Sequence, residues 1–196
     1  MIMPRTNIRD QALLYHITDL DNLESILASG LQPRSSLTEF SDVADPGILQ
    51  GREAFELEHK VPFHFFANNP FDRCVQRSSP EKEFIFLTVR RTLAQGRNWS
   101  VIPRHPLAAG EFTVLDYNPG IESIDWDKMN ERDYDDQESK LTCMAECLAP
   151  STVEPNLLLS IFVRTEPIKT RVLKLCRTHG VNPHVNVQPL MFVNGD

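Results

Sequence analysis

One glutamate in this sequence stands among apolar residues. Glu146 lies in the stretch CMAECLA, between Ala145 and Cys147. A carboxylate in such surroundings costs free energy unless it is paired or used. One interpretation is a glutamate at a strand edge whose head group reaches solvent. The other is a catalytic carboxylate that a rigid strand presents into a cleft, preceded by a flexible loop that shapes a substrate site.

A second group of polar residues stands where an expected strand meets an expected helix. LLYHI is typical of a strand, and apolar residues then recur at helical spacing between Leu20 and Gly30. His16 ends the strand, Thr18 lies in the turn and Asn22 in the first helical turn. Strand ends that face a helix start often hold ligands, because backbone N–H groups there lack partners. Each residue also has an ordinary structural interpretation, as a backbone-bonded histidine or a turn residue.

Three further polar residues have the same ambiguity. Arg52 follows ILQG and would ordinarily be a solvated surface charge. Arg104 and His105 lie between prolines in IPRHP, a sequence typical of a stiff loop. Such a loop is either a surface turn or a support that holds two polar side chains toward a ligand.

Composition bounds the class of protein. The chain has 196 residues, of which 41% are hydrophobic and 24% charged, as expected for one soluble globular domain spanning 1–196. It has neither an apolar run long enough for a membrane nor the apolar core of a secretory signal at its start. Its four cysteines show no paired CxxC spacing, so we expect neither a zinc site nor disulfides. A reducing, cytoplasmic setting is the resulting expectation.

The net charge of −7 argues against a general nucleic-acid binder but leaves room for a local basic patch. Basic residues gather at 90–91, at 97, at 104–105 and along 169–177. Acidic residues crowd the stretch 125–139, for which we expect a helical turn or two followed by a mobile acidic loop.

Many short strands with few helices predict an α+β fold rather than a doubly wound α/β fold. Strands are expected at 61–66, 83–89, 112–117, 141–149, 156–164, 184–188 and 190–193. Helices are expected around 48–58 and over 166–180, the latter capped by Thr165, and a loop over 68–82. No GxGxxG or GxxxxGK sequence is present, which disfavours a Rossmann or P-loop nucleotide site.

The motifs LYHITDLDNLESIL, VPFHF, PRH and MAECL, in this order, resemble the DarT family of bacterial toxins, which are DNA ADP-ribosyltransferases. The family's opening motif reads YHITHxDNLxxIL, and only Asp19 departs from it here. The family's VPFYF corresponds to Val61–Phe65, with His64 where tyrosine is usual. The resemblance covers nearly the whole chain from Tyr15. Its opening motif is fairly specific, whereas each short motif alone is weak.

The resemblance implies an ADP-ribosyltransferase fold of two packed, mainly antiparallel sheets with flanking helices. It also implies a toxin that transfers ADP-ribose from NAD+ to a base of single-stranded DNA and so blocks replication. The transition state of such a transfer is similar to an oxocarbenium ion and needs a nearby negative group and a base. Glu146 is the family's catalytic glutamate by this match. No metal is required.

The same resemblance gives roles to the other candidates. The predicted catalytic residues are Glu146, Arg52 and His105. The predicted NAD-binding residues are His16, Thr18, Asn22, Arg52 and His64, with His16 on the adenosine-side ribose and Arg52 on the pyrophosphate. Arg104 and His105 are the predicted DNA contacts. The implied partners are single-stranded DNA and a DarG-type antitoxin that removes the modification, and no membrane.

Two departures bear on which base is modified. The segment between Arg52 and Val61 is shorter than the family's usual one, and His64 replaces a tyrosine. Within the resemblance, they favour the branch that modifies guanosine over the one that modifies thymidine. Two alternatives stay open: a transferase that acts on RNA or protein, and a nucleotide-binding module without catalysis. Recognition alone needs no carboxylate at Glu146, which separates the module from the enzymes.

Overall fold

The computed structural model describes residues 7–37, 57–105 and 113–193. These residues form a seven-stranded sheet in the order β4-β5-β2-β1-β3-β6-β7. The strands are β1 Leu13–Asp19, β2 Val61–His64, β3 Phe84–Arg90, β4 Ser100–Ile102, β5 Glu146–Ala149, β6 Ser160–Val163 and β7 His184–Val187. Among them, β6 and β7 pair in parallel and the other neighbours pair antiparallel. The α+β prediction is confirmed.

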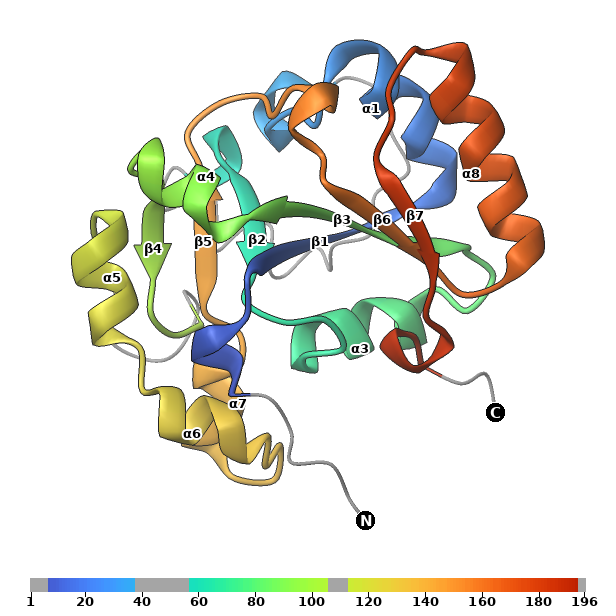
Figure 1. The fold of residues 1–196 in the computed structure, drawn as a ribbon. Coiled ribbons are helices and arrows are strands. Elements are labelled where there is room, and N and C mark those ends of the chain that lie inside the picture. Colours follow the sequence, from blue (N-terminus) through green and yellow to red (C-terminus); the bar gives the residue numbers. More distant parts are fainter. Residues whose placement is uncertain (1–6, 38–56, 106–112, 194–196) are drawn as a thin grey trace.

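Helices flank the sheet on both sides (Figure 1). They are α1 Leu23–Ser29, α3 Pro70–Ser78, α4 Arg91–Gly96, α5 Tyr117–Ser123, α6 Trp126–Glu131, α7 Gln137–Thr142 and α8 Glu166–Thr178. Helices α1 and α8 contact each other. Val75 of α3 packs with Ile17 and Phe86 of the sheet in a small apolar cluster on the other side. Helix α3 therefore covers the sheet face that carries Ile17.

The sheet has two parts that meet at β1. Strand β1 pairs with β3 along its whole length, from Leu13 opposite Arg90 to Asp19 opposite Phe84. With β2 it shares one register pair, Tyr15 opposite His64. Two separate packed sheets were expected, but the structure joins β4-β5-β2 to β1-β3-β6-β7 in one sheet. The expectation fails because β1 bonds a neighbour on each edge.

Helix α3 corrects a second expectation, because 68–82 is not all loop. The Asn69 side chain accepts a hydrogen bond from the Asp72 backbone, and the Asp72 carboxylate accepts one from the Asn69 backbone. Pro70 occupies the first helical turn, where its missing N–H is no loss. This capping box starts the helix. Its sequence signal is asparagine before proline, with an acid three residues after the asparagine.

Other predicted elements differ at their ends. Leu141 and Thr142 end α7, so the strand predicted over 141–149 is confined to β5. The predicted strand over 190–193 is instead a 3-10 turn, Pro189–Met191. Of the strand predicted over 112–117, the described part forms one isolated bridge between Leu115 and Val101. The helix predicted around 48–58 lies largely outside the described residues. Helix α8 is confirmed, although Thr165 makes no side-chain capping bond.

The acidic stretch 125–139 is more regular than expected. Asp125 caps α6 by accepting from the Lys128 backbone, and Asp136 caps α7 by accepting from the backbones of Glu138 and Ser139. Lys128 binds Glu131 at 2.9 Å and Asp136 at 3.0 Å, which links the two helices. The mobile loop predicted for its second half is therefore wrong. Carboxylates at helix N-termini satisfy backbone donors there.

Arg91 lies inside the protein rather than on a basic surface. It is 8% exposed, and its guanidinium donates to the carbonyl oxygens of Leu13, Arg9 and Phe65 at 3.1, 3.0 and 2.8 Å. The group stacks 5.1 Å from the Phe65 ring centroid. Burial lowers the pKa of Arg91 from its usual value. This cation joins strand ends and contributes nothing to the surface charge at 90–91.

Candidate active site

Glu146 lies within the sheet, at the start of β5. It is 5% exposed and stands between His64 of β2 and Ile102 of β4, its register partners on the two sides. Because β5 has a neighbouring strand on each side, Glu146 does not lie at the edge of the sheet. The solvent-reaching strand-edge interpretation is therefore wrong, and the interpretation of a carboxylate held by a rigid strand fits the geometry.

His64 connects the two parts of the sheet. It is the register partner of both Tyr15 on β1 and Glu146 on β5, so these three side chains share one sheet face. Its Nδ1 lies 3.1 Å from the Ala145 carbonyl oxygen. A carbonyl only accepts, so Nδ1 donates the proton. The His64 ring also packs against Phe71 of α3, with centroids 5.2 Å apart.

The His16 side chain on β1 reaches the backbone of β2, near the point where the two parts of the sheet meet. Its Nδ1 donates to the Pro62 carbonyl oxygen at 2.8 Å, and its ring centroid is 5.7 Å from that of Phe63. A carbonyl oxygen only accepts, so Nδ1 carries the proton of this hydrogen bond and fixes the orientation of the ring. The Asn22 side-chain amide donates to the Thr18 hydroxyl at 3.2 Å. Strand β1 continues to Asp19, so His16 does not end the strand and Thr18 lies within it rather than in a turn, while Asn22 precedes α1 as expected.

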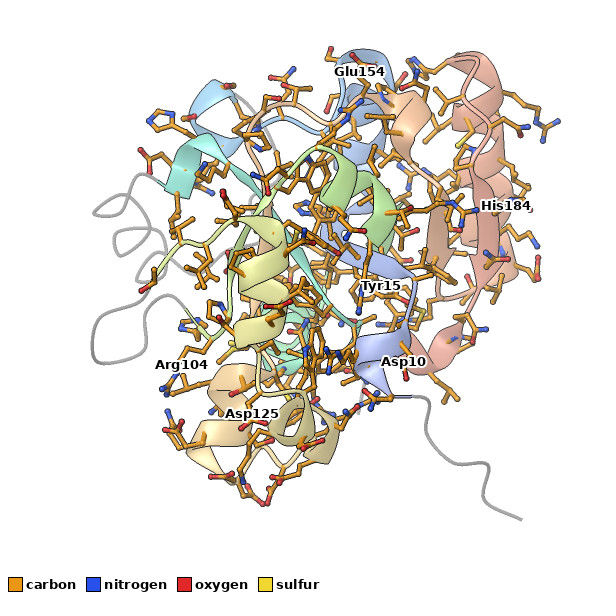
Figure 2. All side chains as sticks on the ribbon, turned by 60° about the vertical axis from the view of Figure 1, so that its left-hand side comes forward. Asp10, Tyr15, Arg104, Asp125, Glu154 and His184 are labelled. Carbon is orange, nitrogen blue, oxygen red and sulfur yellow. The ribbon has the colours of Figure 1, made fainter. Side chains whose placement is uncertain are left out.

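Arg104 and His105 follow β4, two and three residues beyond the neighbour of Glu146. The His105 backbone donates to the Leu141 carbonyl oxygen at 2.9 Å, which fastens the loop to the end of α7. The Arg104 guanidinium lies 3.2 Å from both oxygens of Glu138, and both side chains are exposed. Arg104 points outward at the edge where Asp125 also lies (Figure 2). The predicted DNA-binding arginine is thus already paired with a carboxylate.

Arg52, the predicted pyrophosphate ligand, lies outside the described residues. The structure pairs His64 with Glu146 on the sheet face of Tyr15, whereas His16, the next residue of β1, projects from the opposite face. The loop predicted over 68–82 gave no role to Phe71, which the structure places in α3 against His64. The capping-box signal of α3 would have placed Phe71 in a helix that begins a few residues after His64.

Asp72 is a second buried carboxyl close to this site. It is 1% exposed, and its Oδ2 accepts from the Asn69 side-chain amide at 2.9 Å. Burial raises the pKa of Asp72 to about 8. The group is therefore mostly neutral at pH 7 and adds little negative charge near His64. Among the described residues, no three His, Cys, Asp or Glu side chains are grouped to hold a metal ion.

The arrangement can stabilise a positive charge. A carboxylate fixed by a rigid strand acts on charge that develops as a glycosidic bond breaks, and it needs little reorganisation to do so. An α+β sheet of two joined parts, with a buried glutamate beside that junction, fits the ADP-ribosyltransferase class, and a family match shows that class. Residues 15–193 match the family described as "DarT: ssDNA thymidine ADP-ribosyltransferase, DarT". The chain belongs to this family, whose members are NAD-dependent DNA ADP-ribosyltransferases.

Solved structures show the same fold. Thermus sp. 2.9 DarT in complex with ADP-ribosylated ssDNA is 20% identical, with a TM-score of 0.81, and the match covers 93% of this chain and 96% of that one. The complex of the same protein with NAD+ gives 19% identity, a TM-score of 0.74 and coverage of 94% and 98%. Thermosipho africanus DarTG in complex with ADP-ribose gives 21% and 0.72, covering 93% of this chain and 51% of that one. No curated protein matches.

None of the helices in the described ranges is both long and apolar enough to cross a bilayer.

Proposed function

We propose that this chain is a toxin that transfers ADP-ribose from NAD+ to a base in single-stranded DNA and so blocks replication. The observation that carries the proposal is Glu146, buried on an inner strand beside His64 in the fold of DarT proteins. A module that only recognised nucleotides would have no need of a carboxylate here. The Thermus protein of this fold has been captured with ADP-ribosylated ssDNA and with NAD+, which supports the same substrates.

The candidate residues contact different parts of NAD+. His16 hydrogen-bonds the adenosine-side ribose, while Thr18 and Asn22 line the same pocket. Arg52 holds the pyrophosphate, since a planar guanidinium donates two parallel hydrogen bonds to phosphate oxygens. His64, on β2 between Tyr15 of β1 and Glu146 of β5, completes the proposed set of NAD-binding residues. No metal takes part in this scheme, because the guanidinium supplies the positive charge for the pyrophosphate.

The reaction itself is a displacement at C1 of the nicotinamide ribose. The bond from C1 to the nicotinamide nitrogen breaks, and nicotinamide leaves as a neutral molecule with the electron pair. A nitrogen of the DNA base forms the new bond to C1, and its proton passes to Glu146 and then to water. Glu146 also stabilises the positive ribose while both bonds are weak. His105 orients the base, and Arg104 contacts a phosphate of the DNA strand.

The base is part of the proposal. The family description names thymidine, whereas His64 in place of tyrosine and the short segment before Val61 favour guanosine. The test is incubation of the protein and NAD+ with four single-stranded oligonucleotides, each lacking one base, followed by mass measurement. Loss of labelling with the G-less strand alone would support guanosine. Loss with the T-less strand alone would support thymidine.

The same assay separates the alternatives when RNA and protein arms are added. Labelled RNA or protein with unlabelled DNA would overturn the DNA proposal in favour of another transferase. NAD+ binding without any transfer would favour the nucleotide-binding module.

A partner is also proposed. DarTG of Thermosipho africanus extends well beyond the region that this chain matches, and it was captured with ADP-ribose. We infer that this toxin works beside a DarG-type antitoxin that removes ADP-ribose from DNA. The reaction takes place in the cytoplasm, where replication exposes single-stranded DNA. Co-expression with such a hydrolase should restore growth to cells that the toxin alone inhibits.

A further inference from the structure

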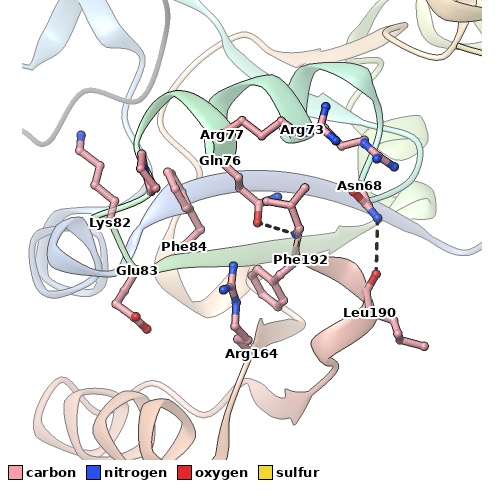
Figure 3. A pocket seen from close by; sticks show the side chains of 12 residues that line it. Asn68, Arg73, Gln76, Arg77, Lys82, Glu83, Phe84, Arg164, Leu190 and Phe192 are labelled. Carbon is pink, nitrogen blue, oxygen red and sulfur yellow. Dashed lines mark hydrogen bonds between the residues drawn. The ribbon is translucent and has the colours of Figure 1, made fainter. Parts of the chain in front are cut away.

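A hollow of about 540 Å³ lies between α3, the start of β3 and the C-terminal segment (Figure 3). Four cations line it: Arg73, Arg77, Lys82 and Arg164. One carboxylate, Glu83, lines it too, and Figure 3 shows its head group directed to the side opposite α3. In a chain with a net charge of −7, such a concentration of positive charge points to an anionic ligand.

Three of the arginines have no acidic partner among the described residues. Arg73 stacks over the Tyr134 ring at 5.9 Å, and Arg164 stacks over Phe192 at 5.5 Å. Neither these two nor Arg77 forms an ion pair with a carboxylate of the described chain. Stacking on a ring holds a guanidinium in place and leaves its edge N–H donors for the oxygens of an anion such as phosphate.

The wall of the hollow is fixed by side-chain amides. Gln76 accepts from the Val193 backbone at 3.2 Å, and the Asn68 amide donates to the Leu190 carbonyl oxygen at 3.5 Å. Both contacts are drawn in Figure 3. They hold the C-terminal segment against α3. The hollow is therefore built by two distant parts of the chain and is not a chance gap between loops.

The hollow opens on the same sheet face as the candidate site. Phe84, which lines the hollow, is the register partner of Asp19, four residues along β1 from Tyr15 and so on its face. Helix α3 links the two places, because Phe71 near its start touches His64 and Arg77 near its end lines the hollow. A helix of nine residues is about 13 Å long. One nucleic-acid strand can span that distance.

The opposite side of the site repels a polyanion. The stretch 125–138 carries seven carboxylates and two cations. One of the carboxylates, Glu138, forms an ion pair with Arg104. Figure 1 shows α3 between α6–α7 and the C-terminal turn, and Tyr134 of the acidic stretch reaches α3, where its ring lies under Arg73 and its hydroxyl donates to the Asn68 carbonyl oxygen. The carboxylates of α6–α7 repel a strand whose reactive base lies at Glu146, whereas the arginines of α3 attract it.

We propose that this hollow binds phosphates of the substrate DNA strand, a short distance from the base that is modified. The inference rests on the proposed function, because it assumes that single-stranded DNA is the substrate. It predicts that DNA affinity depends on the length of the strand. A strand that reaches the hollow binds more tightly than one that covers the reactive base alone.

The test compares two triple variants of equal charge change. Arg73→Gln/Arg77→Gln/Arg164→Gln removes the hollow's unpaired cations, and Arg171→Gln/Lys174→Gln/Arg177→Gln removes exposed cations from α8 as the control. Binding of a labelled 20-nucleotide and a 4-nucleotide single strand is followed by fluorescence anisotropy at several salt concentrations. NAD+ affinity and melting temperature are measured in parallel.

We expect the hollow variant to bind the 20-mer about tenfold more weakly than wild type at low salt, with the control within twofold. The slope of log affinity against log salt should flatten by about 2, since each phosphate contact on single strands contributes about 0.7. Binding of the 4-mer, NAD+ affinity and melting temperature should stay unchanged. A decrease confined to the 20-mer would support the proposal.

Equal binding of the 20-mer by the hollow variant and the control overturns it. So does a binding site for inorganic phosphate or a mononucleotide that the hollow variant loses while its 20-mer slope stays at the wild-type value, because the hollow would then hold a free anion. If the wild-type protein modifies no DNA strand of any sequence, the proposed function itself fails. If it modifies DNA and the hollow variant does so with unchanged length dependence, only the present inference fails.

Discussion

Glu146 and Asp72 are both carboxyl groups with almost no exposed surface, at 5% and 1%, yet they belong to different kinds of structure. Asp72 is part of a capping box, in which its Oδ2 accepts from the backbone and side-chain amides of Asn69 at the start of α3. Glu146 belongs to no cap. It begins an inner strand, beside a histidine that also pairs with β1. Burial by itself therefore does not identify a catalytic carboxylate, and the local motif that accounts for the group has to be examined first.

The strongest test of this comparison is Glu146→Gln. The amide keeps the size of the side chain and most of its hydrogen bonds but removes the charge that stabilises the ribose cation. We expect transfer to DNA to fall by about 100-fold or more, the scale of one preorganised electrostatic group, while NAD+ affinity changes far less. Oligonucleotide labelling rates measured with matched protein concentrations provide the check. Glu154→Gln, an exposed position, is the control.

A further consequence of Glu146→Gln is seen in cells. The wild-type gene should be hard to express without an antitoxin, and the Gln variant should be tolerated. Labelling at close to the wild-type rate by the purified variant would show that the mechanism is wrong.

Asp72→Asn should have the opposite profile, with activity kept and stability altered. The pKa of the folded-state carboxyl is about 8 against a usual value of 3.8, so between these values the folded protein keeps a proton that the unfolded chain has lost. Wild-type stability therefore falls as pH rises through this window and levels above about pH 8. The neutral amide removes that dependence, and the wild-type loss between pH 5 and 8 should exceed that of the variant by about 2 kcal/mol or more.

Urea unfolding of both proteins at pH 5, 6.5 and 8 measures this difference. Identical pH profiles would mean that Asp72 is not protonated in the fold. A large loss of transfer activity in folded Asp72→Asn protein would instead place this carboxyl in the reaction and remove the contrast with Glu146.

The NAD+ pocket predicts a smaller effect. His16→Ala should weaken NAD+ binding by about tenfold, close to the value of one good hydrogen bond to ligand, with the fold intact. Arg52→Ala should have an effect of similar size through the pyrophosphate. Calorimetric titration with NAD+ checks both variants, and His184→Ala on the outer strand β7 serves as the control. Unchanged affinity in both variants would remove these residues from the pocket.

Local patterns in the sequence were sufficient for part of this structure. Strand alternation and helical spacing predicted β1, β3 and α8, and the apolar neighbours of Glu146 predicted a held side chain. The joining of the two parts of the sheet could not be predicted from such patterns, because the single pair between Tyr15 and His64 depends on tertiary packing. The basic hollow was missed for a similar reason. Arg73 and Arg164 are far apart in the sequence and meet only through the C-terminal segment.

The smallest effect is expected at Arg104 and His105, where site and acidic region meet. Arg104→Ala/His105→Ala should weaken DNA binding by about threefold, because the ion pair with Glu138 already screens Arg104 and exposed pairs contribute little. Glu138→Gln should do the reverse and strengthen DNA binding slightly, since it frees the guanidinium for phosphate. Anisotropy with a short single strand and a non-reacting NAD+ analogue measures both. If the double variant and Glu138→Gln both bind DNA as wild type does, the loop makes no phosphate contact, and DNA recognition at this edge depends on other residues.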